Sequence, residues 1–281
     1  MPKKWNTYHT RGIKKKYLYR FMDKEKLIDL LSSKSLYLTR MDRFKDNLEG
    51  IKTYDITELI NHYQDYFHFP ISDKHPDLAD SDFNYLKENA RESLVQQREI
   101  LKKVQNAHFV SCWFNSEKES HAMWSYYAGK GGFAIRFERK EFQENIKQSL
   151  LLNATDDEQS VIVGRIKYQD FKSLIFNEEQ SQVKYLAFRK DNSFEHEKEY
   201  RVVMLDTSSS GQEDHKKYQI TSFNELDITI IVDPEIDDDS FVQFKTELEG
   251  FGENISVVRS ELEPFYQFKK RTERLLKNNL K

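Results

Sequence analysis

The sequence predicts an α+β protein, and three observations carry that prediction. Strand-like and helical segments are interspersed along the 281 residues without a regular strand–helix–strand rhythm, which favours α+β over a doubly wound parallel sheet. Residues 51–107 are highly polar, lack strong strand signals and carry aromatic side chains at helical spacing, so we expect a helical insertion there. The chain has neither repeats nor a linker long enough to divide it, so we expect residues 1–281 to form one domain with that insertion.

Apolar periodicity predicts the order of the elements. Asp23 can cap a helix that begins at Lys24, because apolar residues recur at helical spacing after it. Strands are expected at residues 17–21, 35–39, 108–114, 133–137, 161–168, 228–232 and 255–258. Further helices are expected at residues 84–106, 121–128, 139–152, 172–188 and 239–250, with a polar helix from about Pro264.

The composition is typical of a compact, soluble, cytoplasmic protein. The chain contains 20 Phe, 15 Tyr and 3 Trp beside 32% charged residues, which is enough apolar material for a substantial core. We find no signal peptide and no segment near the roughly 20 apolar residues of a membrane span. Cys112 is the single cysteine, which excludes an internal disulfide and a zinc site built on several thiolates.

The net charge of −3 provides no global basic field that would attract nucleic acid. The charge is uneven, however, because residues 3–16 and 269–281 are both rich in Lys and Arg. If the two ends meet, they form a basic patch that could bind nucleic acid; otherwise they are ordinary solvated ends.

The stretch from Phe194 to Leu205 combines a burst of acidic residues with an apolar strand. Side chains two apart share a face of an extended chain, so Glu197, Glu199 and Arg201 should line one face. The alternate residues, Tyr200, Val202 and Met204, should face the core. Clustered acids cost stability unless a ligand binds there or Arg201 neutralises them. The alternative is a solvated strand start with a local ion pair.

Three segments together resemble the bacterial family called domain of unknown function 2971. They are 18–46 (Leu-Tyr-Arg-Phe with Leu-Tyr-Leu-Thr-Arg-Met-Asp-Arg-Phe-Lys-Asp), 110–137 (Val-Ser-Cys-Trp-Phe, Met-Trp-Ser-Tyr-Tyr-Ala-Gly and Gly-Phe-Ala-Ile-Arg-Phe) and 197–203 (Glu-Lys-Glu-Tyr-Arg-Val-Val). The turn at residues 44–49 departs from the Asn-Asp-Pro-Phe-Glu type of ending in that family. The family name carries no activity.

In the order of its elements the chain is also similar to ADP-ribosyltransferases. Those enzymes have a first strand with Arg or His, a helix, a second strand ending in Ser or Thr, a central aromatic residue and a late strand that opens with Glu. The resemblance implies a mixed or antiparallel split sheet and NAD as the substrate. The matching positions are Arg20, Thr39, an aromatic among Trp124, Tyr126 and Tyr127, and Glu199 with Glu197 two residues before it.

The implied reaction breaks the glycosidic bond of NAD through an oxocarbenium-like transition state, which a nearby carboxylate stabilises. That role falls to Glu199, and Glu197 is either the base that deprotonates the acceptor or a solvated acid. Arg20 would hold the phosphates of NAD or, alternatively, form an ion pair across the sheet. Thr39 would bind the ribose or simply occupy a strand.

The remaining candidates would contact the cofactor at the short helix and at the late strand. Trp124 or Tyr127 would stack on the nicotinamide ring, unless these aromatics belong to the core. Ser125 would line the site, and Arg201 completes the group expected to bind the cofactor.

Three classes of function remain open at this point. The first is an NAD-dependent ADP-ribosyltransferase acting on an unknown acceptor as a bacterial defence or toxin effector, or a variant that hydrolyses NAD. The second is a non-catalytic module that binds nucleic acid, through the basic ends, or protein. The third is a nuclease in which Glu197, Glu199 and Asp46 would hold a divalent metal. The sequence does not specify the oligomeric state.

Overall fold

The computed structural model describes residues 4–46, 102–153, 159–170 and 182–262, together with the single positions 81, 92, 95, 96, 99, 100, 268 and 272. The predicted insertion at 51–107 and the predicted helix from Pro264 therefore lie almost wholly outside the described residues. So does most of the basic C-terminal end, and with it the expected nucleic-acid patch.

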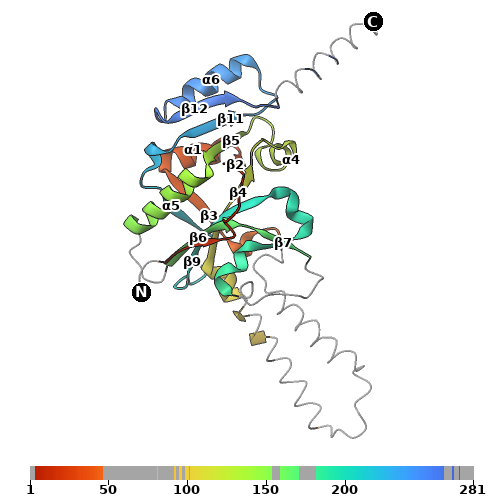
Figure 1. Cartoon of the computed structure of the whole chain (residues 1–281), viewed down its shortest axis with the longest axis vertical. Coiled ribbons are helices and arrows are strands. Elements are labelled where there is room, and N and C mark those ends of the chain that lie inside the picture. Colours follow the sequence, from red (N-terminus) through yellow and green to blue (C-terminus); the bar gives the residue numbers. More distant parts are fainter. Residues whose placement is uncertain are drawn as a thin grey trace.

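The described residues form an α+β structure with a mixed, largely antiparallel sheet, as predicted (Figure 1). The central strand order is β1-β6-β9-β4-β2-β5-β11-β12, and β10 joins through β3, which pairs with β4. Only the pairs β1–β6 and β11–β12 are parallel within this sheet. The strands are β1 (Lys4–Tyr8), β2 (Tyr17–Met22), β3 (Ser35–Arg40), β4 (His108–Ser116), β5 (Phe133–Glu138), β6 (Gln159–Arg165), β9 (Glu199–Asp206), β10 (His215–Gln219), β11 (Ile228–Val232) and β12 (Ile255–Arg259).

Short strands and helical segments complete the described part of the chain. Strands β7 (Lys167–Gln169) and β8 (Arg189–Asp191) pair as a separate parallel ribbon. The helices are α1 (Lys24–Ser33), α4 (His121–Met123), α5 (Arg139–Asn153) and α6 (Asp238–Glu249). The single-turn segments are η1 (Met41–Arg43), η2 (Trp124–Ala128), η3 (Val183–Phe188), η4 (Asn192–Glu197) and η5 (Phe223–Glu225).

One face of the sheet carries the main core. Alternation along the strands sends Leu18, Trp113, Ile135 and Val202 to this face, where they pack with buried residues of α1, α5 and α6. Helix α1 begins as predicted, because the Asp23 side chain accepts a hydrogen bond from the Lys26 amide. Figure 1 shows α6 lying beside β11 and β12 at one end of the sheet.

The opposite face carries two smaller apolar clusters. One contains Tyr8, Val110 and Val203 beneath η3. The other contains Phe21 and Phe114 beneath α4 and η2. Neither cluster includes the polar side chains that β9 presents to this face between them, so a polar area separates the two.

The sheet divides at β4. One edge of β4 pairs with β9 over seven residues, from His108 to Phe114. The other edge pairs with β2 only at residues 114–116 and with β3 only at residues 109–110. Between these two pairings, the ladders with β2 and β3 leave a gap of three residues on that edge of β4. The sheet forks there, with β2 leading to β5 and β3 leading to β10.

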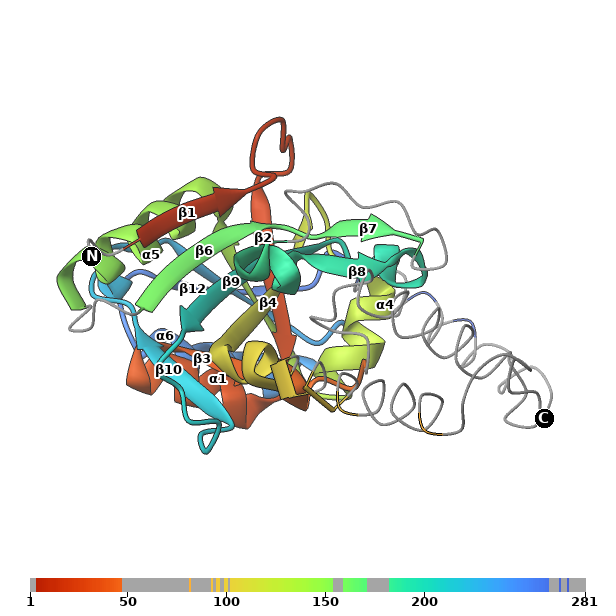
Figure 2. The ribbon, with the colours of Figure 1, turned by 90° about the horizontal axis from the view of Figure 1, so that it is seen from below.

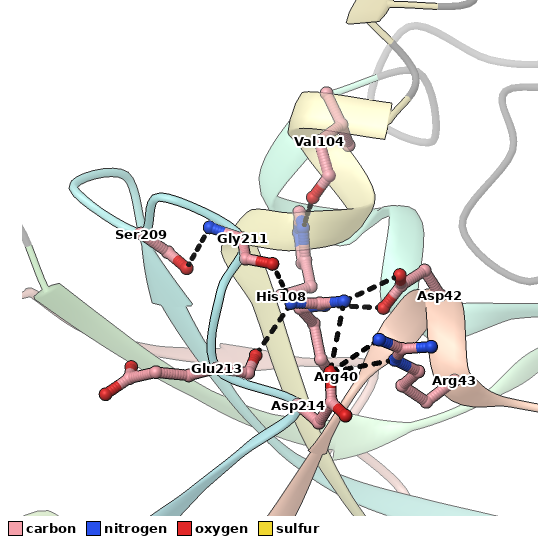
Figure 3. A network of polar contacts seen from close by, with 9 residues as sticks. All are labelled: Arg40, Asp42, Arg43, Val104, His108, Ser209, Gly211, Glu213 and Asp214. Atoms are coloured by element: carbon pink, nitrogen blue, oxygen red, sulfur yellow. Dashed lines mark hydrogen bonds and ion pairs between the residues drawn. The ribbon is translucent and has the colours of Figure 1, made fainter.

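A buried guanidinium closes the corner after β3. Arg40 Nε and Nη2 donate to the two carboxylate oxygens of Asp42 at 2.6 and 2.9 Å. Arg40 Nη1 donates to the carbonyl oxygens of Gly211 and Glu213 at 2.5 and 2.8 Å, while the exposed Arg43 holds Asp214 (Figure 3). Residues 40–46 therefore contain a turn tied to the β9–β10 connection. This network fixes the end of β3 that follows Thr39.

All seven predicted strands are present, and the differences are local. The strand expected at 161–168 divides at Ile166 into β6, which pairs with β9, and β7, which pairs with β8. The Ile166 amide still donates to the Glu199 carbonyl in the register of the β6–β9 ladder. The helix expected at 172–188 is wrong over its described end, where η3 is a 3-10 turn. Strands β1, β8 and β10 were not predicted. Figure 2 shows β1 beside β6 at the edge of the sheet.

Candidate functional site

The acidic stretch folds differently from the extended chain that alternation predicted. Residues 192–197 form the 3-10 turn η4, which Asp191 caps by accepting a hydrogen bond from the Ser193 amide at 3.0 Å. Lys198 then adopts a left-handed conformation with φ of 42°, and β9 begins at Glu199. The backbone therefore follows a different path from the predicted one. The two carboxylates still lie side by side, because the turn brings Glu197 next to Glu199.

Four buried charged groups meet at this point. Lys190, from β8, places its Nζ 2.5 Å from Glu197 Oε2 and 2.7 Å from Glu199 Oε1. Arg201 Nε donates to Glu199 Oε2 at 2.7 Å, and Arg201 Nη1 donates to the Ala187 carbonyl at 2.7 Å. Two carboxylates are thus balanced by two cations in an area that water scarcely reaches. The exposed fractions are 8% for Lys190, 7% for Glu197, 5% for Glu199 and 1% for Arg201.

Two tyrosines extend the group. The Tyr127 hydroxyl donates to Glu197 Oε1 at 2.6 Å, and the Tyr168 hydroxyl accepts a hydrogen bond from the Glu199 amide at 2.8 Å. Tyr127 is 48% exposed, so its ring reaches solvent while its hydroxyl serves the buried carboxylate. We refer to Tyr127, Tyr168, Lys190, Glu197, Glu199 and Arg201 as the carboxylate cluster.

The two carboxylates have opposite proton affinities. Burial raises the pKa of Glu199, but the attraction of Arg201 and Lys190 outweighs burial and holds that pKa well below its usual range. Burial and the neighbouring Glu199 raise the pKa of Glu197 by more than Lys190 and Tyr127 lower it. Burial and the Glu197 carboxylate raise the pKa of Tyr127, so its phenol stays protonated. Acid pairs whose environments separate their pKa values can divide the acid, base and charge-stabilising roles of a reaction.

A cavity of about 650 Å³ opens at the fork of the sheet. Within the carboxylate cluster, Tyr127, Lys190, Glu197, Glu199 and Arg201 line it. Apolar side chains from both small clusters and residues of α1 form much of the remaining wall. Ligand pockets are commonly about 300–1,000 Å³, so this volume suits a sizeable small molecule.

Six of the eight residues expected at the site line this cavity. They do so from two faces of the sheet. Thr39 pairs opposite Val110, on the face that carries Glu199. Arg20 alternates with Leu18 and Met22 and so leaves β2 on the face of the main core. Because the sheet is open between β2 and β3, the cavity reaches both faces of the sheet. The six are Arg20, Thr39, Tyr127, Glu197, Glu199 and Arg201.

Arg20 occupies the fork itself. Its Nη1 donates to Ser111 Oγ at 2.9 Å, and both terminal nitrogens lie 3.5 Å from the Tyr37 carbonyl oxygen. Its guanidinium carbon lies 5.7 Å from the centre of the Trp113 ring. No carboxylate of the described residues lies within ion-pair distance of Arg20, so the ion pair considered for it is not formed there. A guanidinium that keeps its charge while lining a cavity can bind an anion.

The other two expected residues do not line the cavity. Trp124 is buried in the smaller cluster beneath α4 and η2, and its Nε1 donates to Glu119 Oε2 at 2.9 Å. Ser125 is exposed, and its hydroxyl donates to the His121 carbonyl at 3.1 Å. Their places in the site are corrected accordingly: the π-helical turn η2 points Tyr127, and not these two neighbours, towards the carboxylates.

Sequence reasoning missed Lys190 and Tyr168. Lys190 precedes Glu199 by nine residues, and only the turn η4 and the left-handed Lys198 bring its ammonium back to the carboxylates. Tyr168 comes from β7, next to Lys190 in the ribbon. The one sequence signal was the excess of clustered acids, which needs more positive charge than Arg201 alone supplies.

Metal binding has no structural support in the described part of the chain. No three His, Cys, Asp or Glu side chains gather there in a way that could hold an ion. Tyr127, Lys190 and Arg201 already donate hydrogen bonds to the four carboxylate oxygens of Glu197 and Glu199, which the nuclease alternative would need. Among the same residues, no helix combines the length and apolar character of a membrane span.

Comparison with known proteins finds a family match over part of the chain. Residues 123–202 match the family described as "Protein of unknown function (DUF2971)". No curated protein and no solved structure matches the chain. The matched segment contains Tyr127, Lys190, Glu197, Glu199 and Arg201, whereas Arg20 and Thr39 lie outside it. The family resemblance expected from the sequence is thereby supported over residues 123–202, for a family whose description states no activity.

Proposed function

We propose that the cavity binds NAD and that the carboxylate cluster cleaves its nicotinamide–ribose bond, as an ADP-ribosyltransferase or an NAD hydrolase does. A single observation carries the proposal: Arg20, Thr39, Tyr127, Glu197 and Glu199 line one cavity although they are scattered over 180 positions of the chain. These are the residues that the resemblance in element order implied.

Each side chain has a chemical part in this proposal. Glu199 stays ionised at neutral pH, so its negative charge can stabilise the oxocarbenium-like sugar. Glu197, with its raised pKa, can accept a proton from the attacking acceptor or water. Arg20 lacks a carboxylate partner among the described residues and can hold a phosphate. The exposed ring of Tyr127 offers a flat surface for nicotinamide.

The direct test is the release of nicotinamide from labelled NAD by the full chain, alone and with cell extract as a source of acceptors. Glu199→Gln should lower the release at least a hundredfold, because a neutral amide cannot stabilise the sugar cation. The matched control is Glu253→Gln, since Glu253 is exposed and does not line the cavity. Equal losses in both variants, or no release by the unaltered chain despite measurable NAD binding, would overturn the enzymatic proposal.

One observation favours a second candidate, a non-catalytic binding module. The charges of Glu197 and Glu199 are already balanced by Lys190 and Arg201, which is how a structural ion network also looks. Calorimetry separates the two: a ligand that binds without turnover, and binds Glu199→Gln equally well, supports the module. A carboxylate needed for turnover supports the enzyme.

A further inference from the structure

Lys190 is the group in this site whose purpose the proposed reaction does not explain. It belongs to β8, outside the main sheet, and its side chain reaches into the cavity wall. Its ammonium lies 2.5 Å from Glu197, 2.7 Å from Glu199 and 4.4 Å from the centre of the Phe194 ring. Burying a lysine is costly unless its charge is matched, so its position between two acids indicates a specific role.

We infer that Lys190 is a positioning residue that keeps Glu197 a carboxylate and holds it in place, so that Glu197 can act as the base. The catalytic meaning of this inference rests on the proposed function. The effect of Lys190 on the charge of Glu197 does not depend on the proposed function, and it can be measured without NAD.

The two carboxylates differ in the number of cations that hold them. Glu199 has two cationic partners, Arg201 and Lys190, so it keeps one if Lys190 is removed. Glu197 has one cationic partner among the described residues, and that partner is Lys190. Without Lys190, Glu197 would face the Glu199 carboxylate with only a neutral phenol in support. A proton shared between the two acids is then the favourable state.

The other groups around Glu197 cannot replace Lys190. The Tyr127 hydroxyl, from η2, donates a hydrogen bond but carries no positive charge. Arg201 directs its Nε to Glu199 and one Nη to a backbone carbonyl. Within the described part of the chain, the titratable or charged groups around Glu197 are Cys112 (β4), Tyr127 (η2), Tyr168 (β7), Lys190 (β8), and Glu199 and Arg201 (β9).

The surrounding elements hold the Lys190 ammonium beside the two acids. The β7–β8 ribbon sets Lys190 opposite Tyr168, whose hydroxyl accepts a hydrogen bond from the Glu199 amide. The turn η4 then places Phe194 against the same ammonium. Lys190 is thus fixed by the segment that ends in the two acids, and the cation and its carboxylates are held together by ten consecutive residues, 190–199.

The test is a carbon NMR titration of the glutamate carboxyl groups in the full chain, with the Glu197 signal assigned through Glu197→Gln. In Lys190→Met the pKa of Glu197 should rise by at least one unit, so that at a given pH the ratio of its ionised to its protonated form falls at least tenfold. The control is Lys140→Met, because Lys140 is exposed and does not line the cavity. A Glu197 titration in Lys190→Met that matches the control would overturn the inference.

Two further variants separate charge control from simple packing. Lys190→Arg keeps the positive charge and should leave the Glu197 pKa close to that of the unaltered chain. If Lys190→Met does not fold, Lys190→Met/Glu197→Gln should restore folding, since the amide imitates a protonated Glu197 and the charges balance again. A double variant no more stable than Lys190→Met, or an arginine variant that behaves like methionine, would contradict the inference.

The outcomes distinguish the inference from the proposed function. If nicotinamide is never released but Lys190→Met raises the Glu197 pKa, the enzymatic proposal fails and the inference about charge stands. If nicotinamide is released and Lys190→Met leaves both the Glu197 titration and the pH profile of release unchanged, the inference fails and the enzymatic proposal stands.

Discussion

At the scale of single residues, the site is defined by two acids with different surroundings. Glu199 meets two cations and stays ionised, whereas Glu197 shares one of them and retains a raised pKa. Their difference was not visible in the sequence, because both are glutamates two positions apart. It comes from Arg201, which pairs with Glu199, and from burial and the Glu199 charge, which raise the pKa of Glu197.

Tyr127→Phe tests the contribution of one hydroxyl to this balance. The phenol donates to Glu197 and stabilises its ionised form, so its loss should raise the Glu197 pKa further. A hydrogen bond to a charged group is worth about 1.5–3 kcal/mol, and one pKa unit is about 1.4 kcal/mol. We therefore expect the acidic limb of the pH profile of acceptor modification to move up by about one to two pH units, because Glu197 acts as a base only when ionised.

The neighbouring residue supplies the control for that measurement. Tyr126 is 71% exposed and does not line the cavity, so Tyr126→Phe should leave the acidic limb where it is. Equal profiles for Tyr127→Phe and the unaltered chain would show that the hydroxyl does not tune Glu197.

At the scale of elements, the fork at β4 decides what the site contains. Thr39 and Glu199 share one face of the sheet, and Arg20 reaches the same cavity from the other face because β2 and β3 separate. Alternation along a strand could be predicted from the residues, and it correctly sent Tyr200, Val202 and Met204 to the core. The strands that pair with each part of β4 could not be predicted from the sequence, since pairing across a sheet depends on contacts between distant segments.

Gly164→Ala tests the pairing of β1 with β6 at the edge of the sheet. A Cβ at Gly164 would lie 2.1 Å from the Tyr8 carbonyl oxygen, so β1 would have to move away. Such overpacking typically costs about 1–3 kcal/mol, and we expect a loss of this size in the free energy of unfolding. Urea denaturation followed by circular dichroism measures it.

Gly250→Ala provides the comparison, because Gly250 has a right-handed helical conformation and its nearest non-bonded neighbour would lie 3.3 Å from a new Cβ. Its free energy of unfolding should change by well under the loss seen for Gly164→Ala. Similar values for the two variants would mean that β1 is not held closely against β6.

At the scale of the whole molecule, the carboxylate cluster links folding to pH. The folded-state pKa of Glu199 lies below its unfolded value, which is about 4.3. A depressed carboxyl pKa gives stability that is present above the unfolded pKa and is lost as the pH falls through the folded pKa. The molecule should therefore lose stability below about pH 4.3 partly through this one side chain.

Glu199→Gln should lower the free energy of unfolding at pH 7 and also flatten its fall in acid. Removing one proton-linked group reduces the slope by up to about 1.4 kcal/mol per pH unit. Urea denaturation at pH values from 7 down to 3 measures both effects, with Glu253→Gln as the exposed control. Parallel curves for Glu199→Gln and the unaltered chain would mean that Glu199 is not preferentially ionised in the folded state.

The sequence by itself determined most of the described elements of this protein and the identity of its clustered acids. The capped helix after Asp23, the seven strands and the polar face of Glu199 and Arg201 all follow from short-range preferences, which depend on neighbours along the chain. Only the tertiary structure decided that Lys190 sits between the acids, that Trp124 belongs to the core and that Arg20 enters through a fork in the sheet. Those positions depend on strand pairing and turn geometry between segments far apart in sequence, which no local pattern encodes.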